Sequence, residues 1–595
     1  MNMTNPEISK LLRDVAAAYA IKDEKKFRFQ IIAYQKAADS IDYTSIELRD
    51  LYRENKLASL PGVGASIRSH IEELFKTGKV EHFQEVLKDI PASVFPLLEI
   101  PSFGPKKAYR LVSEFHLINP ETVIADVTDL AQAGEIARHQ GFGEKSQQDI
   151  LQAIQEYSLG KTKTARMVLP YANELAEKIV AYLKKCPAAK QVYPLGSLRR
   201  RASTIGDVDI AVATTDPGAV LNHFIAYPYK TRVIEKGDRT ASILLSSERQ
   251  IDLMTQPPQG FGSLLQHFTG SKAHNIHLRE YAISKGLSLS EYGIKKKIGG
   301  KDILQQYDTE EAFYNALRLQ WIPPEMREDT GEIELAIQQK VPQLVELQDM
   351  KGDLHLHSSY PIEPSHDMGQ DAMEIMIEKA IALNYEYIGF AEHNPSVSKH
   401  SASQIYEILE NRNKQIEQLR QKYQKYLHIY ALLEVDIQPN GDLAIDNTSL
   451  ELLDAALVSV HSAFDMDQTA MTKRVLKGLS HPKARILAHP TGRLLNQRSI
   501  YDLDWDVVFD FCKEHKKALE INAQPLRLDL PDMLVKAAVK KGVQLVIDTD
   551  SHAASHMDFM EYGVAVARRG WATEQNIINS LPYKRFHEWL QNNER

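Results

Sequence analysis

The order of hydrophobic and polar positions changes along this chain of 595 residues. Residues 1–160 carry apolar residues at three- and four-residue spacings, interrupted by Gly and Pro, which predicts short amphipathic helices. Two later runs, DVDIAV (207–212) and RQIDLMTQ (249–256), alternate apolar and polar positions as strands do. From Lys351 onward, short apolar runs alternate with helical patterns, which predicts a parallel sheet closed into a barrel. A chain of this length exceeds one core, so we expect several domains.

Three glycine-containing turns precede predicted helix starts in the first segment: LPGVGASI (60–67), IPSFGPKKA (100–108) and QGFGEKSQQDI (140–150). Glycine lets a phosphate approach the backbone, and the free N–H groups of a helix N-terminus face the anion. One such turn also fits an ordinary helix-to-helix connection, but three together favour phosphate binding. The turns resemble helix-hairpin-helix motifs, which implies that they hold a DNA backbone, although Ser102 stands where the second motif usually has its first Gly. The candidate DNA-binding residues are Gly62, Gly64, Gly104, Gly141 and Gly143.

Two carboxylates share one face of the strand predicted at 207–212, because a period of two sends Asp207 and Asp209 to the same side. The pair alone also fits a solvated strand end. A metal site is favoured by the upstream turn of Gly196 and Ser197, which suits a polyphosphate, and by the guanidinium groups of residues 199–201. Mg²⁺ binds through carboxylates and substrate phosphates, so a nucleotide is the expected companion. Asp252, on the second alternating run, completes three ligands for two-metal phosphoryl transfer.

Over about its first 320 residues the chain resembles the family X DNA polymerases. The resemblance rests on GSLRRRASTIGDVDI (196–210), on IDL (251–253) and on HFTGSKAHNIHLREYAISKGLSLSEYGI (267–294). The segment IPPEMREDTGEIELA (322–336) is similar to the one that follows the polymerase core in the bacterial branch. The resemblance implies a DNA polymerase that uses Mg²⁺ and dNTPs on gapped or primer-template DNA. It assigns the metals to Asp207, Asp209 and Asp252, the triphosphate to Gly196, Ser197 and Arg200, the incoming base to Asn275 and the template to Arg279.

Two positions depart from that family's pattern. His70 stands where beta-type enzymes carry the Lys that forms a Schiff base with a 5′-deoxyribose phosphate, and imidazole cannot form one stably. We therefore expect weak or absent lyase activity by this route, unless Lys76 or Lys79 serves instead. His267 falls where the animal enzymes carry a Tyr beside the nucleotide sugar, which puts rejection of ribonucleotides in question.

Potential metal ligands gather in the last part of the chain, where 13 of the 21 histidines follow residue 350. His355 and His357 lie two apart on a predicted strand, so both imidazoles face one side. A single His, Asp or Glu at the end of a strand usually has a structural role. Here, however, several successive apolar runs each end in such a residue. With the first pair these make eight N and O ligands, enough for two or three metal ions. The strand-end residues are His393, Glu434, His461, His489, Asp550 and His552.

This C-terminal part, from Gly352 to about Leu590, resembles the polymerase and histidinol phosphatase (PHP) domain. The resemblance implies a 3′ to 5′ exonuclease that binds Mn²⁺ or Zn²⁺ and prefers Mn²⁺. The family's SDG after the first histidines is absent, so either Glu363 or Asp367 must replace its carboxylate. The alternatives for this C-terminal part are a metal-stabilised scaffold and a phosphatase of small phosphates. The alternative for the whole chain is a nonenzymatic DNA clamp that uses only the N-terminal glycine turns. Arg493 is a candidate for substrate phosphate or for a surface salt bridge.

Composition says more about the cellular location of the protein than about its substrate. No uninterrupted apolar run approaches the roughly 18 residues of a membrane helix, and only Cys186 and Cys512 are available for a disulfide. With an N-terminus lacking an apolar signal core, this predicts a cytoplasmic protein without membrane contact, which we expect to be monomeric. The formal net charge is −8, but residues 161–350 carry 25 Lys and Arg against 22 Asp and Glu, so net charge decides little about DNA.

We expect a multidomain protein with α-helical N-terminal domains, an α+β nucleotidyltransferase palm with its thumb, and an α/β PHP barrel. The predicted divisions are a helical DNA-binding domain (1–85), a helix-hairpin-helix fingers-like domain (86–160), the palm (161–260), the thumb (261–320), a linker (321–350) and the PHP domain (351–595).

Overall fold

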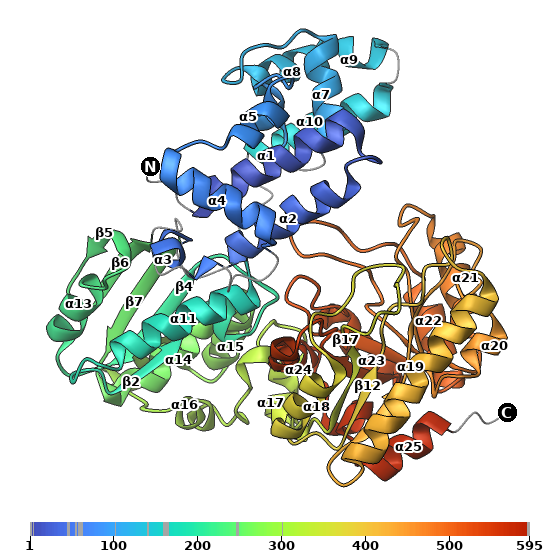
Figure 1. The fold of residues 1–595 in the computed structure, drawn as a ribbon. Helices are drawn as coiled ribbons and strands as arrows, with labels where there is room; N and C mark the ends of the chain where they lie inside the picture. The colour runs from blue at the N-terminus through green and yellow to red at the C-terminus, as the bar shows by residue number, and fades with distance from the viewer. Residues whose placement is uncertain are drawn as a thin grey trace.

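A computed structural model of the chain describes residues 3, 5–43, 48–53, 56–57, 63–100, 103–139, 142–158, 166–245, 249–299 and 301–591. Figure 1 shows a helical unit (residues 5–158) above two units that contain sheets, the middle unit (166–320) and the C-terminal unit (351–591). No helix among the described residues is long and apolar enough to cross a membrane.

Short helices build the helical unit, as the three- and four-residue spacing predicts. On α1 the side chains of Ile8, Leu12 and Val15 are fully buried, which is the stripe that faces the unit's own core. The helices are α1 (Asn5–Asp23), α2 (Arg28–Tyr43), α3 (Leu48–Arg53), α4 (Ala65–Thr77), α5 (Glu81–Leu87), α6 (Val94–Leu97), α7 (Pro105–Glu114), α8 (Val123–Gln132), α9 (Glu135–Arg138) and α10 (Glu144–Ser158).

A five-stranded mixed sheet in the order β2-β4-β7-β6-β5 forms the centre of the middle unit. Along β4, Ile210 and Val212 join one core cluster while Ala211 and Ala213 join another beneath α14, so both faces of the strand are covered. The elements are β1 (Met167–Val168), α11 (Leu169–Leu183), β2 (Gln191–Pro194), α12 (Gly196–Arg199), β3 (Thr204–Ile205), β4 (Val208–Ala213), α13 (Pro217–Ile225), β5 (Lys230–Lys236), β6 (Thr240–Leu245), β7 (Gln250–Gln256) and α14 (Phe261–Thr269).

A smaller antiparallel sheet, β10-β9-β8, follows and packs with two helices. Its elements are α15 (Lys272–Ser284), β8 (Leu287–Ser290), β9 (Gly293–Ile298), β10 (Lys301–Gln305) and α16 (Glu310–Ala316). The next 30 residues, 321–350, contain α17 (Glu332–Ile337), and they are packed rather than extended, because Ile322, Met326 and Arg327 are fully buried.

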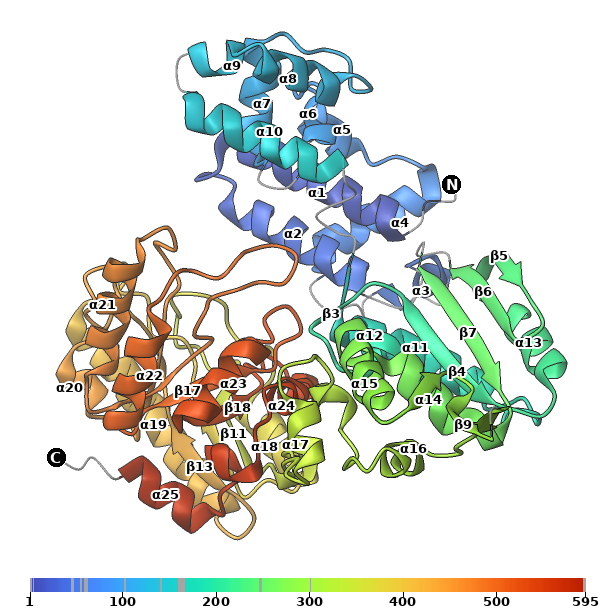
Figure 2. The same ribbon diagram turned by 180° about the vertical axis from the view of Figure 1, so that it is seen from behind.

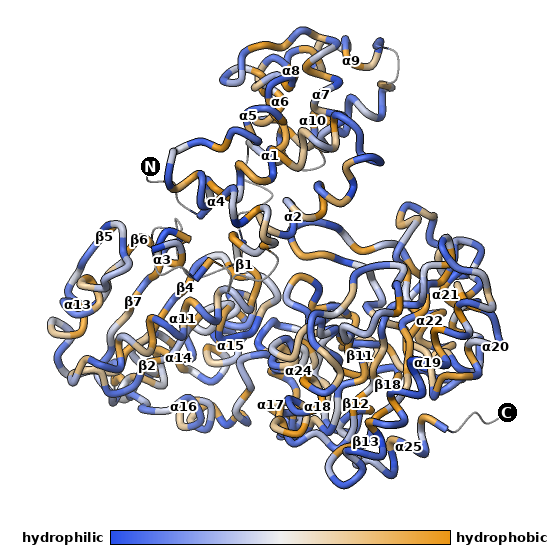
Figure 3. The backbone as a smooth tube through the Cα atoms, viewed as in Figure 1, coloured by the Kyte–Doolittle hydropathy of each residue, from blue (hydrophilic) through white to orange (hydrophobic). Residues whose placement is uncertain are grey.

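Strands and helices alternate through the C-terminal unit, which confirms the pattern predicted from Lys351 onward. The strands are β11 (Gly352–Leu356), β12 (Tyr387–Phe390), β13 (His428–Ala431), β14 (Glu434–Asp436), β15 (Ala456–Ser459), β16 (Ala484–Leu487), β17 (Ala518–Asn522) and β18 (Gln544–Asp548). The helices are α18 (Met373–Ala382), α19 (Ala402–Tyr423), α20 (Asn447–Leu450), α21 (Gln468–Leu479), α22 (Trp505–Glu514), α23 (Asp532–Lys541), α24 (Met560–Arg569) and α25 (Tyr583–Gln591). In Figure 3 hydrophobic residues gather along β11, β12 and β18.

These strands form two parallel sheets, β11-β12-β13 and β14-β15-β16-β17-β18. One link between the sheets is the chain itself, because only two residues separate β13 from β14. At the other end, a parallel bridge pairs Leu356 with Ser551, and the backbone N–H of His357 donates to the carbonyl of Ser551 at 2.8 Å. The carboxyl ends of these strands therefore lie close to one another.

The units contact one another directly. One hydrophobic cluster runs from the middle unit into the C-terminal unit and includes both Ile210 and Leu356. The helical unit reaches the C-terminal unit through Lys36 on α2, whose Nζ lies 2.9 Å from Asp367 Oδ2. Cys186 and Cys512 are both buried and unpaired, so the described chain has no disulfide.

Candidate functional site

Two of the predicted metal-binding aspartates lie side by side on parallel strands. Asp209 of β4 and Asp252 of β7 are register partners, and Asp207 comes directly before β4. Gln250 Nε2 donates to the two carboxylate oxygens of Asp252 at 2.9 and 3.1 Å, and the Ser242 hydroxyl also donates to it. The sheet therefore fixes the spacing of this carboxylate pair.

The turn before these strands must be glycine at one position. Gly196 has a φ of +56°, and a Cβ there would lie 2.9 Å from Asp209 Oδ2. A side chain at 196 would therefore be strained and would collide with the carboxylate. Ser197 follows on the short helix α12, so the predicted phosphate turn lies directly against the aspartates.

Charge crowding is the main electrostatic feature of this site. Burial, followed by the neighbouring carboxylates of Asp252 and Asp207, raises the pKa of Asp209 to about 6. A divalent cation would relieve this repulsion, and oxygen ligands suit Mg²⁺. The donor set therefore fits the predicted metal.

The three arginines that follow Ser197 have different partners. Arg199 donates to the buried carboxylate of Glu310 at 2.9 and 2.6 Å, and Arg201 donates to Asn173 at 2.9 Å. Arg200 pairs with Glu328 at 2.9 Å and donates to the carbonyl of Thr269 at 2.7 Å. Arg199 is thus committed to a structural ion pair, which the sequence pattern did not reveal.

The predicted nucleotide and template residues meet around His267. Asn275 Nδ2 donates to the His267 carbonyl at 2.7 Å, and its Oδ1 accepts from Gln266 at 2.8 Å. Arg279 Nη2 lies 3.4 Å from His267 Nδ1. Burial, with the nearby Arg279, lowers the pKa of the His267 imidazole, so the ring is neutral at pH 7.

The described glycines of the three predicted turns each stand directly before a helix. Gly64, Gly104 and Gly143 precede α4, α7 and α10, are exposed, and have open space where a Cβ would be. Gly64 and Gly104 have negative φ values of −66° and −90°, which any residue adopts. Neither packing nor conformation within the protein requires glycine at these two positions, and the open space leaves room for an external group. Gly62, Gly141 and Ser102 lie outside the described residues.

Glu434 is the centre of the histidine cluster in the C-terminal unit. Its Oε2 lies 2.9 Å from His393 Nδ1 and 3.1 Å from His355 Nε2, and its Oε1 lies 2.8 Å from His489 Nε2 and 3.3 Å from His461 Nε2. Burial alone would raise the pKa of Glu434, but the surrounding imidazoles hold it well below its usual range. Oε2 also lies 3.6 Å from His357 Nε2, so one buried carboxylate faces five predicted ligands.

The remaining predicted ligands join the same cluster. Asp550 Oδ1 lies 3.2 Å from His357 Nε2, and the rings of His357 and His552 stack at 4.2 Å. Burial and the neighbouring His552 hold the pKa of His357 well below its usual value, which keeps the ring in the neutral form that binds metals. All eight ligands predicted from the strand pattern thus lie in one cluster.

Buried ring nitrogens test whether metal ions fit here. Four of the imidazoles have a buried nitrogen that makes no hydrogen bond among the described residues, although His393 Nδ1 is close to Glu434 without hydrogen-bond geometry: His357, His393, His489 and His552. A buried polar atom without a partner is costly unless another group satisfies it. Four groups of three residues each bring their ligand atoms within 4.8 Å of one another, and three of these groups contain only predicted ligands, among them His393, Glu434 and His461. Nitrogen and oxygen ligands at this spacing suit Mn²⁺ or Zn²⁺.

The structure separates the two candidates for the missing carboxylate. Asp367 lies 3.6 Å from His393 Nε2 and 3.8 Å from His552 Nε2, at the edge of the cluster. Glu363 is 65% exposed and pairs instead with His400 at 3.2 Å. Asp367 therefore has the position of a ninth ligand.

Three supporting residues were missed from the sequence. Glu520 accepts from His355 Nδ1 at 2.6 Å, and Asp436 accepts from His461 Nδ1 at 2.7 Å, so each carboxylate orients one imidazole. Asp436 also lies 3.2 Å from His366. The end of the apolar run ALEIN could have indicated Glu520, and the position of Asp436 two residues after Glu434 on one strand could have indicated that residue.

Arg493 forms no surface salt bridge among the described residues. Its Nε donates to the carbonyl of Arg527 at 2.8 Å and another nitrogen donates to the carbonyl of Leu528. It therefore holds the loop that brings Arg527 Nε to within 3.4 Å of Asp550 Oδ2.

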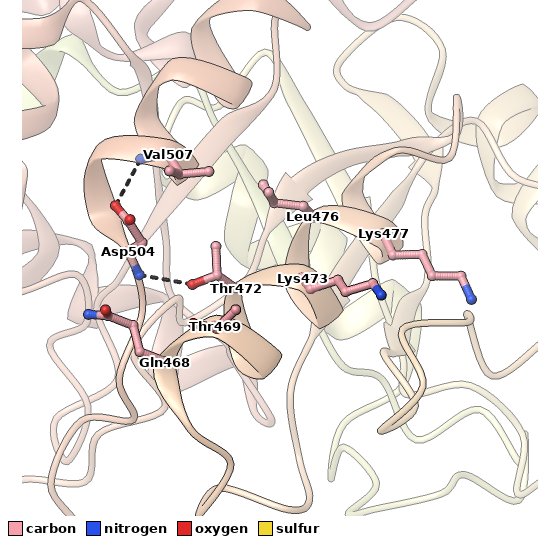
Figure 4. A pocket seen from close by; sticks show the side chains of 8 residues that line it. All are labelled: Gln468, Thr469, Thr472, Lys473, Leu476, Lys477, Asp504 and Val507. Atoms are coloured by element: carbon pink, nitrogen blue, oxygen red, sulfur yellow. Dashed lines mark hydrogen bonds between the residues drawn. The ribbon is translucent and has the colours of Figure 1, made fainter.

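A shallow pocket of about 560 Å³ lies between α21 and α22, lined by Thr472, Lys473, Leu476 and Val507 among others. Figure 4 shows Asp504 hydrogen-bonded to Thr472 and to the backbone of Val507 at its edge. None of the predicted site residues lines it.

Two family models match parts of the chain, and known proteins are similar to it over about half or all of its length. Residues 3–80 match a helix-hairpin-helix domain model, and residues 264–328 match the DNA polymerase beta thumb. The chain is 32% identical to the DNA polymerase/3′-5′ exonuclease PolX of Bacillus subtilis over 594 residues, which covers 100% of both chains. It is 24% identical to DNA polymerase lambda of Arabidopsis thaliana over 317 residues (49% of this chain, 54% of the relative) and 22% identical to that of Rattus norvegicus over 354 residues (54% and 56%). On full-length similarity and the matching domains, this chain belongs to the family X DNA polymerases.

Proposed function

We propose that the middle unit is the polymerase, adding dNTPs to a primer 3′ end on gapped or primer-template DNA with Mg²⁺. The register pairing of Asp209 with Asp252, beside the Gly196 turn, is the observation that carries this proposal. Bound ions would polarise the phosphate and stabilise the charge that develops in the transition state. Asp207 and Asp209 would hold both ions, while Asp252 would hold one near the primer hydroxyl and help take up its proton.

Other residues of the middle unit would orient the substrate. Ser197 and Arg200 would bind the triphosphate, which requires Arg200 to exchange its contact with Glu328 for one with phosphate. Asn275 would contact the incoming base and Arg279 the template strand, from neighbouring turns of α15. His267 would lie beside the nucleotide sugar.

Mg²⁺ affinity at this site should fall below pH 6. The folded pKa of Asp209, about 6, lies above the ordinary value of 3.8, so in the metal-free protein its ionisation lowers the free energy of unfolding as pH rises between those values. Mg²⁺ requires the ionised form and competes with the proton. We expect about a tenfold loss of apparent affinity for each pH unit below 6, measured by calorimetric titration. An affinity that stays constant from pH 7 to pH 5 would contradict this.

We also propose that the C-terminal unit is a 3′ to 5′ exonuclease that binds Mn²⁺ or Zn²⁺. The convergence of five imidazoles on Glu434 supports this proposal, as does the name of the Bacillus subtilis relative. Bound ions would ionise a water molecule and polarise the phosphodiester. The bridge between Leu356 and Ser551 supports closure of the two sheets into the predicted barrel.

Asp367, rather than Glu363, should be the ninth ligand. We expect Asp367→Asn to lower the molar metal content of the purified protein by about one equivalent, because a carboxylate ligand becomes a neutral amide. The matched change Glu363→Gln should leave it unaltered, since Glu363 pairs with His400. Metal content is measured by plasma emission spectroscopy. The opposite pattern would assign the ligand to Glu363.

The helical unit should hold DNA through the glycine turns but show weak lyase activity. His70 Nδ1 is hydrogen-bonded to the Tyr34 hydroxyl at 3.0 Å, and its ring stacks on His82 at 4.8 Å. Borohydride trapping on a 5′-deoxyribose phosphate substrate should yield little covalent adduct, because an imidazole cannot replace an amine. Efficient trapping that disappears in Lys76→Ala or Lys79→Ala would identify the serving lysine.

A single experiment tests the two activities together. On one gapped DNA, Asp207→Ala should abolish extension and keep 3′ degradation, and His355→Ala should do the reverse. Loss of degradation in Asp207→Ala alone would overturn the assignment. We also propose that the domain boundaries are those predicted from the sequence. We propose further that the protein acts as a monomer and that it is cytoplasmic.

A further inference from the structure

Arg569, at the end of α24 in the C-terminal unit, reaches the proposed nucleotide site. Its Nη1 donates to the backbone carbonyl of Arg200 at 2.9 Å and lies 2.9 Å from Glu328 Oε1. The same oxygen of Glu328 is the partner of Arg200 Nε at 2.9 Å. One carboxylate oxygen is therefore shared between two guanidinium groups, one from each unit.

Arg569 is itself fixed in place. Its Nε and Nη2 both contact Asp532 Oδ2, at 2.7 and 2.6 Å, and the side chain is 9% exposed. Arg200 is 14% exposed and Glu328 29%, so the cluster is mostly shielded from solvent. Charge-assisted hydrogen bonds that are shielded from solvent are stronger than those at an exposed surface. In Figures 1 and 2, α24 lies where the two lower units meet.

Glu328 and a triphosphate compete for Arg200. Glu328 neutralises Arg200 while it is paired with it, and an incoming triphosphate must displace that pairing. Arg569 offers Glu328 a second cation on the same oxygen, so the carboxylate stays compensated when Arg200 turns away. Without Arg569, Glu328 would depend on Arg200 alone.

We propose that Arg569 is a positioning residue for nucleotide binding: by sharing Glu328 with Arg200, it keeps Arg200 available to the triphosphate. The C-terminal unit thereby sets the nucleotide affinity of the polymerase site. This inference rests on the proposed role of Arg200 as a triphosphate ligand.

The neighbouring Arg568 provides a matched control. It lies on the same helix and joins the same segment of chain, with Nε 2.8 Å from Glu325 and Nη1 donating to the carbonyl of Val345 at 3.0 Å. Among the described residues its hydrogen bonds and ion pairs involve neither Arg200 nor Glu328. Loss of Arg568 removes an inter-unit ion pair without touching the shared carboxylate.

The test is steady-state primer extension by the full chain with Mg²⁺, giving KM for dNTP and kcat separately, alongside 3′ degradation and the melting temperature. We expect Arg569→Gln to raise KM about tenfold with kcat within twofold, and Arg568→Gln to leave KM within twofold. Glu328→Gln should lower KM about threefold. The double variant Arg569→Gln/Glu328→Gln should match Glu328→Gln, because the competing charge is gone. These magnitudes correspond to one charge-assisted hydrogen bond or less.

The outcomes separate this inference from the function beneath it. If Arg200→Ala leaves KM unchanged, the proposed role of Arg200 fails. If Arg200→Ala raises KM while Arg569→Gln does not, or if Arg569→Gln and Arg568→Gln behave alike, only the positioning role fails. Arg569→Lys keeps the positive charge but removes the planar guanidinium group with its several donors. A KM between those of wild type and Arg569→Gln, at an unchanged melting temperature, supports the inference. A wild-type KM would show that the hydrogen bonds of the guanidinium group are not required.

Discussion

Replacing Asp252 by Asn should reduce primer extension about a thousandfold, which corresponds to about 4 kcal/mol of lost transition-state stabilisation. Asp252 is the register partner of Asp209, and its carboxylate accepts hydrogen bonds from the side chains of Ser242 and Gln250. An amide of equal size keeps the packing but removes the charge needed to hold a cation and accept the primer proton. The loss should therefore appear in kcat, measured by single-nucleotide incorporation under single-turnover conditions.

Ser242→Ala is the matched control for Asp252→Asn. It removes one hydrogen bond to the carboxylate and leaves its charge, so we expect a loss of about tenfold or less. Both variants should keep wild-type 3′ degradation, since Asp252 lies outside the histidine cluster. Near-normal extension by Asp252→Asn would show that the third carboxylate is dispensable and would remove the two-metal interpretation.

The features visible in the sequence were those set by local periodicity. A period of two placed Asp207 and Asp209 on one face, and apolar runs ending in polar residues indicated ligands such as His393 and Glu434. In a parallel sheet the carboxyl ends of the strands meet, so residues distant in sequence come together without any information beyond the pattern. The helical first segment followed from its spacing in the same way.

Contacts between distant segments left no such pattern. Glu520 and His355 are 165 positions apart, and Glu328 and Arg569 are 241 apart. Arg199 looked equivalent to Arg200 in the sequence, but only the fold shows that Glu310 engages the first and Glu328 the second. Pairings of this kind depend on which surfaces face each other.

The choice between Glu363 and Asp367 as the missing ligand could not be made from the sequence for a different reason. It is an irregular loop, so no periodicity tells which carboxylate faces the cluster. Glu363 has a φ of 47°, and its side chain points toward His400, whereas Asp367 meets His393 and His552. The helical unit also approaches here, with Lys36 at Asp367, a contact between residues 331 positions apart.

Glu434→Gln should abolish metal binding and 3′ degradation in the C-terminal unit. Five imidazoles converge on this one carboxylate, and they hold its pKa well below the usual range, which favours its charged form. A neutral amide of the same size removes the only charge shared by these ligands. We expect a loss of degradation of about a thousandfold.

Glu520→Gln provides the graded comparison with Glu434→Gln, because Glu520 orients His355 from behind rather than facing the ligands. Loss of such an orienting carboxylate costs about 10 to 100-fold in metal affinity. Added Mn²⁺ should therefore restore much of the 3′ degradation by Glu520→Gln. Added Mn²⁺ should not rescue Glu434→Gln, whereas extension by both variants should stay within twofold of wild type. If Glu434→Gln degrades DNA normally with a normal metal content, the histidine cluster is not the nuclease centre, and its metals only stabilise the fold.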